Sequence, residues 1–203
     1  MPRQSSENQR IRDDRRQQIL RAASHVFARK GLAATTIADI AQAAGVSHGL
    51  AYHYFASKEE IFAQLIRRAM EGTEHLLLAA RAREGTVTTR LRWLIEVMIE
   101  GASDSADDLL IVQQAAISEA VPPEIRELVL QRPPVMVHSL SQLIREGQSN
   151  GELISGDPEV LALLLLSCIE GIFSSMSLRF QPQTIQSIQS IEADTLLQLF
   201  MSR

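Results

Sequence analysis

The residue types that most often carry metal or thiol chemistry are few and scattered in this sequence. The one cysteine is Cys168, and the five histidines are His25, His48, His53, His75 and His138. They do not recur at the spacing of a zinc site, either with one another or with the cysteine. Cys168 lies in an apolar run with Leu166 and Ile169, which is typical of a small buried hydrophobic residue. We therefore expect no catalytic residue, no metal and no cofactor.

The distribution of charge points instead to chemistry with phosphate. The formal net charge is -4, but the chain through Phe55 carries eight Arg and Lys against four Asp and Glu. The remainder carries 12 basic and 20 acidic residues. A basic end on an acidic body fits a protein that presents that end to a polyanion, although an unevenly charged solvated surface gives the same count. A motif has to decide between the two.

The segment from Thr36 to Phe55, TIADIAQAAGVSHGLAYHYF, supplies that motif. Two short helical stretches flank Gly45, which can adopt the positive φ of a tight turn. Ser47 caps the second stretch, so that its unpaired amides face outward, where phosphate can bind. His48 and its neighbours then project from a short helix of the size that enters the major groove of DNA.

Helical spacing also dominates the rest of the chain, and no strand-like alternation is sustained. We expect a loose arm up to about Arg10, then a helix that ends at Gly31, and a long helix that begins at the Ser57–Glu60 capping box. Later helices are expected at about Leu91–Ile99, Asp107–Ala120, Asp157–Arg179 and Thr184–Met201, and Pro133 and Pro134 either begin a helix or kink one. The predicted fold is all-α with about nine helices. A three-helix DNA-binding domain at 1–57 precedes a larger helical domain at 58–203.

The helix expected at Asp157–Arg179 is apolar nearly all round, so it must be buried on more than one side. A second copy of the chain is the simplest cover, and an extended core within one chain is the alternative. The last helix supplies a matching apolar stripe of Leu196, Leu197, Leu199 and Phe200. The stretch Val160–Ile169 falls short of the roughly 20 residues that span a bilayer. With no signal peptide and one cysteine, we expect a cytoplasmic protein with no membrane segment.

The first third of the chain resembles the tetracycline-repressor-like (TetR) family of transcriptional regulators. The residues that carry the resemblance are Ile19, Ala22, Ala23, Phe27–Gly31, Thr35–Ala41, Ala44–Ser47, Gly49, Tyr52–Phe55 and Ser57–Glu59. The resemblance implies a two-domain helical homodimer whose last two helices form the dimer bundle. It also implies a small-molecule effector pocket in the second domain and a DNA operator as partner.

The resemblance also implies roles for individual residues. The expected DNA-binding residues are Thr35, Thr36, Ser47, His48, Gly49, Leu50, Tyr52, His53, Tyr54 and Lys58. Thr35 or Thr36 and Lys58 would bind phosphate, and Gly49 would allow close approach to the DNA. Family members often have Lys or Arg where this chain has His48, so that phosphate contact would be weaker and sensitive to pH. The arginines 10, 12, 15 and 16 are either a minor-groove arm or a solvated start of the first helix.

The effector pocket is expected on the helices that the family uses for it. Its candidate lining residues are Trp93, Met98, Met136, His138, Glu170, Phe173 and Met176, although Met and aromatic residues at helical spacing are more often core. The expected function is a repressor that a small molecule releases from a palindromic operator. The alternatives are a ligand-binding helical protein without DNA binding, and an enzyme that uses Cys168 or a histidine.

Overall fold

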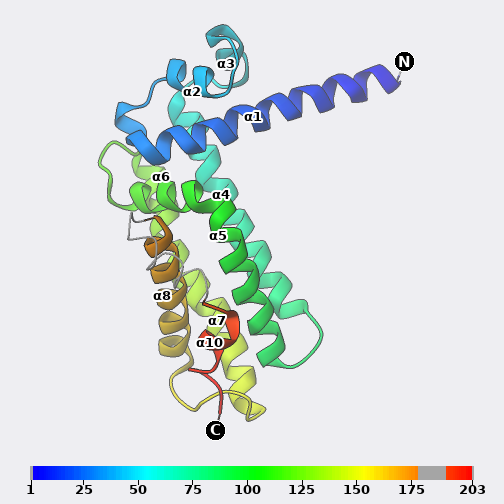
Figure 1. Ribbon diagram of the computed structural model, residues 1–203, viewed down its shortest axis with the longest axis vertical. Coiled ribbons are helices and arrows are strands. Elements are labelled where there is room, and N and C mark those ends of the chain that lie inside the picture. The colour runs from blue at the N-terminus through cyan, green and yellow to red at the C-terminus, as the bar shows by residue number, and fades with distance from the viewer. Residues whose placement is uncertain (1, 178–190, 203) are drawn as a thin grey trace. The chain divides into compact units, whose positions relative to one another are not determined.

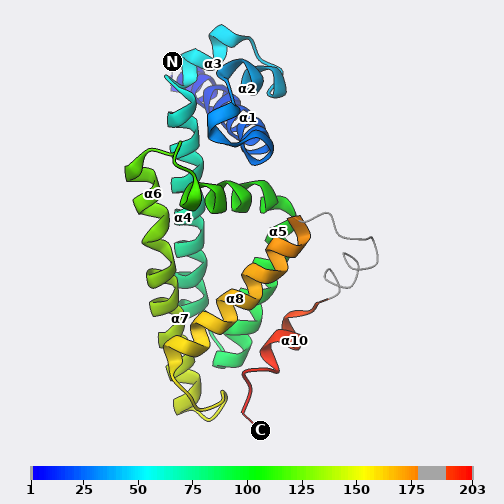
Figure 2. The same cartoon turned by 90° about the vertical axis from the view of Figure 1, so that its left-hand side faces the viewer.

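The structure, a computed structural model, describes residues 2–177 and 191–202 (Figures 1 and 2). Nine helices lie in these ranges, which hold no strand and one isolated antiparallel bridge between Leu153 and Met201. The predicted all-α class is therefore confirmed. The chain forms two compact units: the first extends up to Ala69 and includes Leu110–Val129, and the second holds Met70–Leu109 and the residues from Leu130 onward. This division does not test the predicted boundary after residue 57, which stays a prediction.

The first helix, α1, spans Pro2–Ala34, and its regular backbone breaks at Gly31, where φ is +72° and ψ 168°. This confirms the predicted stop, because glycine adopts positive φ at little cost. The residues up to Arg10, predicted to be a loose arm, are helical instead. Proline is favoured in the first turn of a helix, and no glycine follows Pro2 until Gly31. Gln9 also donates a hydrogen bond to Asp13, one turn further on, at 3.0 Å.

The core of the first unit holds α1 against α2 (Ile37–Ala43) and the start of α4 (Lys58–Ala82), with α3 (His48–Tyr54) adjoining α2. Phe27 and Phe62 meet edge to face, with 5.2 Å between ring centroids. The other fully buried side chains here include Ile19, Leu20, Ile40, Phe55, Ile61 and Ile66. Aromatic pairs of this geometry add stability beyond the area that they bury. The short α2 and α3 therefore rest on a rigid apolar base.

Two helices expected around Leu91–Ile99 and Asp107–Ala120 form a single helix, α5, at Val87–Ile117. Gly101, between them, is not among the glycines with positive φ, so the backbone does not turn there. The proline pair begins a new helix rather than kinking one: α6 spans Pro123–Leu130 and α7 spans Arg132–Ser149, with proline in its first turn. The amides in the first turn of a helix have no partner within the helix, so proline, which has no amide proton, loses nothing there.

The core of the second unit lies among α4, α5, α7 and α8 (Pro158–Ser177). Its buried members on α8 are Leu161, Ala162, Leu165, Leu166, Ile169, Ile172 and Phe173. By length and composition only, the stretch Pro158–Ser175 is apolar enough to cross a membrane, with a mean hydropathy of 1.5, so it is longer than the predicted stretch Val160–Ile169. A core helix of a soluble protein meets the same criterion, and 39% of this stretch is buried inside the unit.

The end of the chain differs from the prediction of one helix at Thr184–Met201. Residues 184–190 lie outside the described part of the chain, Glu192 is extended, and the described helix, α10, spans Ala193–Leu197. Leu196, Leu197 and Phe200 are buried in the core of their own chain, so they are not free to form a stripe against a partner, whereas Leu199 is 63% exposed. The amide of Ile154 donates to the carbonyl of Phe200 at 2.9 Å and holds this segment in place.

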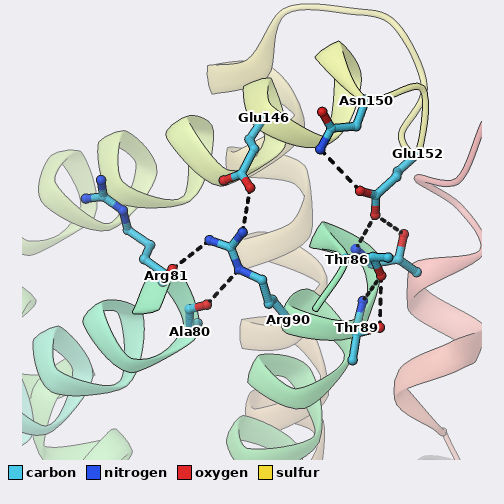
Figure 3. Close-up of polar contacts among 9 residues, drawn as sticks. Ala80, Arg81, Thr86, Thr89, Arg90, Glu146, Asn150 and Glu152 are labelled. Atoms are coloured by element: carbon cyan, nitrogen blue, oxygen red, sulfur yellow. Dashed lines mark hydrogen bonds and ion pairs between the residues drawn. The ribbon is translucent and has the colours of Figure 1, made fainter. Parts of the chain in front are cut away.

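A buried arginine joins three helices of the second unit (Figure 3). Nε of Arg90 donates to the carbonyl of Ala80 at 3.1 Å, and Nη2 donates to the carbonyl of Arg81 at 2.7 Å. Nη1 forms an ion pair with Glu146 on α7 at 2.6 Å. The carbonyls in the last turn of a helix have no partner within it. Arg90 on α5 therefore caps α4 and ties it to α7.

Glu152, in the turn between α7 and α8, caps the start of α5 in the same region (Figure 3). It accepts hydrogen bonds from the amide of Thr88 at 2.8 Å and from the hydroxyl of Thr88 at 3.0 Å. Partial desolvation raises the pKa of Glu152, but the hydrogen bonds from Thr88, Val87 and Asn150 lower it by more, so the pKa lies below its ordinary value. The carboxylate is thus fixed in its charged form.

Candidate nucleic-acid interface

The first helix of the motif begins with a complete capping box. The hydroxyl of Thr36 accepts from the amide of Asp39 at 3.1 Å, and the carboxylate of Asp39 accepts from the amide of Thr36 at 2.9 Å. Lys30 on α1 forms an ion pair with Asp39 at 2.7 Å. These contacts satisfy two of the free amides at the start of α2 and fix α2 to α1.

The turn between the two short helices depends on Gly45, whose φ is +64°. The amide of Val46 donates to the carbonyl of Ala41 at 3.0 Å, which closes the turn. Gln18 on α1 donates from Nε2 to the carbonyl of Ala44 at 2.7 Å. This backbone conformation is rare for any residue with a Cβ atom. The predicted role of Gly45 as the turn residue is confirmed.

The second helix of the motif, α3, keeps one residue in the core and presents most others to solvent. Ser47 caps it by accepting from the amide of Leu50 at 3.2 Å, as predicted. Ala51 is fully buried, and its small side chain lets α3 lie close to the core. Ser47, His48, Gly49, Tyr52 and His53 are exposed, and Leu50 and Tyr54 are half-buried.

The exposed side chains of α3 also contact one another. The rings of His48 and Tyr52 meet edge to face with 4.9 Å between centroids, and those of His53 and Tyr54 do so at 5.4 Å. Tyr52 nevertheless remains 50% exposed, so most of its contacts with the core are absent. Hydroxyl, imidazole and aliphatic groups thus share one exposed face, which can donate, accept and make apolar contact with base edges.

Two residues expected to bind phosphate have other partners. Thr35 is completely buried, and its hydroxyl donates to the carbonyl of Gly31 at 2.7 Å, so of the two threonines only Thr36 is accessible. Lys58, at the start of α4, donates from Nζ to the carbonyls of Leu32, Ala33 and Thr35 at 2.9, 3.1 and 2.8 Å. An ammonium group has three protons, and all three are used in capping the end of α1.

These contacts give a prediction for Lys58→Met. The variant should unfold at a lower temperature, because three carbonyls lose a charged donor worth about 1.5–3 kcal/mol per hydrogen bond at most. The salt dependence of DNA binding should not change, since a lost phosphate contact would reduce the slope of log K against log salt by about 0.9 per site. Fluorescence anisotropy across a salt titration measures that slope. A slope reduced by about one or more would return Lys58 to the phosphate-binding set.

Asp39 gives a prediction for pH. The hydrogen bond from Lys30 and the bonds from the hydroxyl and amide of Thr36 lower the pKa of Asp39 from 3.8 to about 2. A lowered pKa adds stability that is complete above the ordinary value and is lost as the pH falls toward the folded value. The melting temperature of the wild type should exceed that of Asp39→Asn by a constant amount above about pH 5, and this difference should shrink between about pH 4 and 2. A constant difference down to pH 2 would contradict the assignment, and Asp13→Asn on the exposed part of α1 is the control.

The arginines of α1 divide into two sets. Arg16 donates to Gln64 on α4 at 2.8 Å and lies over the ring of Phe55, 5.1 Å from its centroid, so it helps to hold the unit together. Arg10, Arg12 and Arg15 are exposed on a helix rather than on a loose arm. Of the two alternatives for this segment, the helical one is observed.

Four of the seven predicted effector residues belong to one apolar core, and their role in binding an effector stays a prediction. Met136 and Phe173 are buried in the core of the second unit, and Trp93 and Met98 pack against it. His138 and Glu170 are exposed, and the side chain of Met176 lies outside the described part of the chain. No group of three or more His, Cys, Asp or Glu residues that could hold a metal ion occurs within the described ranges. Arg132, which no sequence pattern singled out, is half-buried at the start of α7.

The geometry defines a helix-turn-helix protein of the DNA-binding class, and comparison with known proteins identifies its family. The profile of the bacterial regulatory proteins of the tetR family matches residues 19–65. The profile of the tetracyclin repressor-like C-terminal domain matches residues 84–174. The chain belongs to the TetR family of transcriptional regulators.

Relatives of known name span most of the chain. It is 32% identical over 167 residues to the HTH-type transcriptional regulator YfiR of Bacillus subtilis, which covers 81% of this chain and 80% of YfiR. It is 34% identical to the transcriptional repressor KstR2 of Mycobacterium tuberculosis, over 70% of this chain and 72% of that protein. It is 28% identical to the transcriptional regulator TtgR of Pseudomonas putida, over 77% of each chain.

Solved structures have the same fold over nearly the full length. The ketosteroid transcriptional regulator KstR2 of Mycobacterium tuberculosis superposes with a TM-score of 0.71 at 23% identity, over 93% of this chain and 96% of that chain. A transcriptional regulator of Saccharomonospora viridis, solved in complex with choline, gives a TM-score of 0.75 at 22% identity, over 94% of this chain and 100% of that chain. The profile of the family's C-terminal domain, at residues 84–174, covers a large part of the second unit and also the Leu110–Val129 part of the first.

Proposed function

We propose that this regulator is a repressor that binds a palindromic operator as a homodimer and that a small-molecule effector releases it. The observation that carries the proposal is the exposed face of α3. Ser47, His48, Gly49, Tyr52 and His53 face solvent on a helix that Ala51 and the turn at Gly45 fix to the core. A rigid helix whose polar and aromatic side chains have little contact with their own core is suited to reading base edges. Thr36 and the amides at the start of α2 and α3 are suited to phosphate.

The second copy of the chain covers an apolar row on α8. Val160, Leu163 and Leu164 are 52%, 53% and 51% exposed, and the exposed small residues Ser167 and Gly171 continue the same helical face. Single exposed leucines are common, but a continuous apolar row marks an interaction surface. The exposed Leu199 lies beyond α10 and belongs to the same proposal. The interface therefore depends mainly on α8, because Leu196, Leu197 and Phe200 of the last segment are buried in their own core.

Effector release is a shift between two states of the dimer. In one state the two α3 helices are spaced for the operator, and in the other they are not. A ligand that binds the second state more tightly lowers operator affinity, at most by the ratio of its affinities for the two states. A coupling of about 1–3 kcal/mol changes operator affinity roughly 5–150-fold. The productive spacing places the two α3 helices about 34–36 Å apart, one turn of DNA, or at a related distance. We place the protein in the cytoplasm and assign it no catalytic role.

The test is DNA binding across a salt titration, with duplex fragments from the promoter region of its own gene. Log K should fall linearly with log salt, with a slope of about -5 for six phosphate contacts. One fragment should bind at least about a thousandfold tighter than the others, as specific sites do. Binding that is undetectable, or equal for all fragments, would contradict the proposal and favour a ligand-binding protein without an operator.

A further inference from the structure

The second unit holds an arginine, Arg132, that forms no ion pair with any acidic side chain in the described part of the chain. Arg132 begins α7, is half-buried, and donates from Nη2 to the hydroxyl of Thr73 on α4 at 2.8 Å. Its Nε is shielded from solvent and has no hydrogen-bond partner. No ion pair is formed by Arg132 with any described residue, in contrast with Arg90 and Arg92 of the same unit. A guanidinium stays charged in a protein, so removing it from water without a counter-ion costs free energy.

The position of Arg132 places this charge at the end of an apolar core. Arg132, Met136 and Leu140 recur at intervals of four residues, so they lie on one face of α7, and the last two are buried. Thr73 likewise shares a face of α4 with Leu77, which is buried in the same core. On α8, Glu170 lies three residues before the buried Phe173. Arg132 and Thr73 are thus in contact beside the apolar core, and the exposed Glu170 on α8 lies near enough for its charge to act on Arg132.

The electrostatics of Arg132 agree with this placement. Desolvation lowers the pKa of its guanidinium, and the nearby charge of Glu170 raises it by less. Among the described arginines, only Arg132 has a resolved shift. Arg16 and Arg126 also have an unpaired Nε, but both belong to the first unit. Arg16 lies over the ring of Phe55, and Arg126 donates to the carbonyl of Val121. Glu170 therefore acts on Arg132 from a distance without neutralising it.

Building on the proposed repressor function, we propose that Arg132 binds the carboxylate of an acidic, largely apolar effector. The flat guanidinium matches the two oxygens of a carboxylate, and its Nε, which is shielded from solvent in the structure, has no other partner. Thr73 holds the guanidinium in place through Nη2. The hydrocarbon part of the effector contacts the apolar faces that end at Met136 and Phe173. Binding supplies the missing counter-ion at the junction of α4, α7 and α8.

The experiment measures acids against their neutral amides. The probes are linear alkanoates from hexanoate to tetradecanoate, phenylbutyrate and a bile acid, each paired with its primary amide. Binding is followed by calorimetry and by the fluorescence of Trp93, the one tryptophan of the chain. At least one acid should bind the wild type tenfold or more tighter than its amide. Arg132→Gln should remove that preference, Arg132→Lys should keep part of it, and Glu170→Gln should strengthen it.

Arg145→Gln is the matched control, because Arg145 is exposed on the same helix, and it should leave acid binding unchanged. A melting temperature within a few degrees of the wild type, with unchanged DNA affinity, shows that Arg132→Gln is folded. If Arg132→Gln does not fold, the proposal is tested by the preference for acid over amide, measured in the wild type and in Glu170→Gln. Acids that fail to bind, that bind no tighter than their amides, or that bind Arg132→Gln equally well would overturn the proposal.

DNA release separates this proposal from the proposed function. Acid binding that depends on Arg132 but leaves DNA binding unchanged would support the site and contradict the ligand-released repressor. Release of DNA by the neutral amides, equally in the wild type and in Arg132→Gln, would support the repressor and overturn the Arg132 site.

Discussion

Glutamate at both Leu163 and Leu164 is expected to convert the protein from a dimer to a monomer and to lower operator affinity by about a hundredfold or more. Both side chains are about half exposed in the single chain, at 53% and 51%, and belong to the apolar row on α8. In the dimer, four carboxylates would be removed from water against an apolar partner surface. The effective penalty is several kcal/mol for each buried ion.

Sedimentation at micromolar concentration distinguishes a species of 22.5 kDa from one of twice that mass. The matched control is Leu78→Glu, because Leu78 is 52% exposed on α4 and lies outside the proposed interface. The control should remain a dimer with unchanged melting temperature. A dimeric double variant with normal DNA affinity would show that α8 is not the interface, and a monomeric wild type would contradict dimerisation altogether.

The second large effect is expected at Arg90. Replacing it with methionine keeps most of the buried hydrocarbon but removes three hydrogen bonds, to the carbonyls of Ala80 and Arg81 and to Glu146. The two carbonyls then lie beside an apolar side chain, and each buried unsatisfied group costs about 1–3 kcal/mol. We expect a loss of about 2–4 kcal/mol in the free energy of unfolding, which lowers the melting temperature by about 5–15 °C.

Glu146→Gln is the control for Arg90→Met. The side chain of Glu146 is 48% exposed, so loss of its charge should cost less than about 1 kcal/mol. Urea unfolding measures both variants. Equal stability losses would mean that the ion pair, rather than the capping of α4, is the main contribution of Arg90. A change below about 0.5 kcal/mol for Arg90→Met would contradict the role given to the network.

The sequence predicts best those features that local chemistry determines. Gly31 and Gly45 adopt positive φ, and Thr36 and Ser47 cap their helices because their hydroxyls reach free amides three residues on. The cap at Ser57 also forms, although Glu60 accepts from the amide of Ala56 rather than from that of Ser57. Each of these depends on residues close together in the chain.

Features that depend on distant partners could not be predicted in this way. Lys58 and Thr35 look like phosphate ligands by position. Lys58 instead donates to carbonyls at the end of α1, which only the folded unit brings near it, and Thr35 is buried by the packing of that unit. The apolar residues near Phe200 suit a partner chain or their own core equally well, and the bridge between Leu153 and Met201 decides for the core. Arg132 stands out only through its missing partner, which no sequence pattern reveals.

The central claim is that the exposed face of α3 reads DNA, and the double variant Tyr52→Ala with His53→Ala tests it most directly. Operator affinity is measured by fluorescence anisotropy on the duplex that binds the wild type best. Loss of base contacts worth about 1–3 kcal/mol each, in both half-sites, should weaken binding by at least about a hundredfold. Dimer mass and melting temperature should not change. His75→Ala, an exposed histidine on α4, should bind like the wild type. A folded, dimeric double variant that binds the operator as tightly as the wild type would contradict the claim.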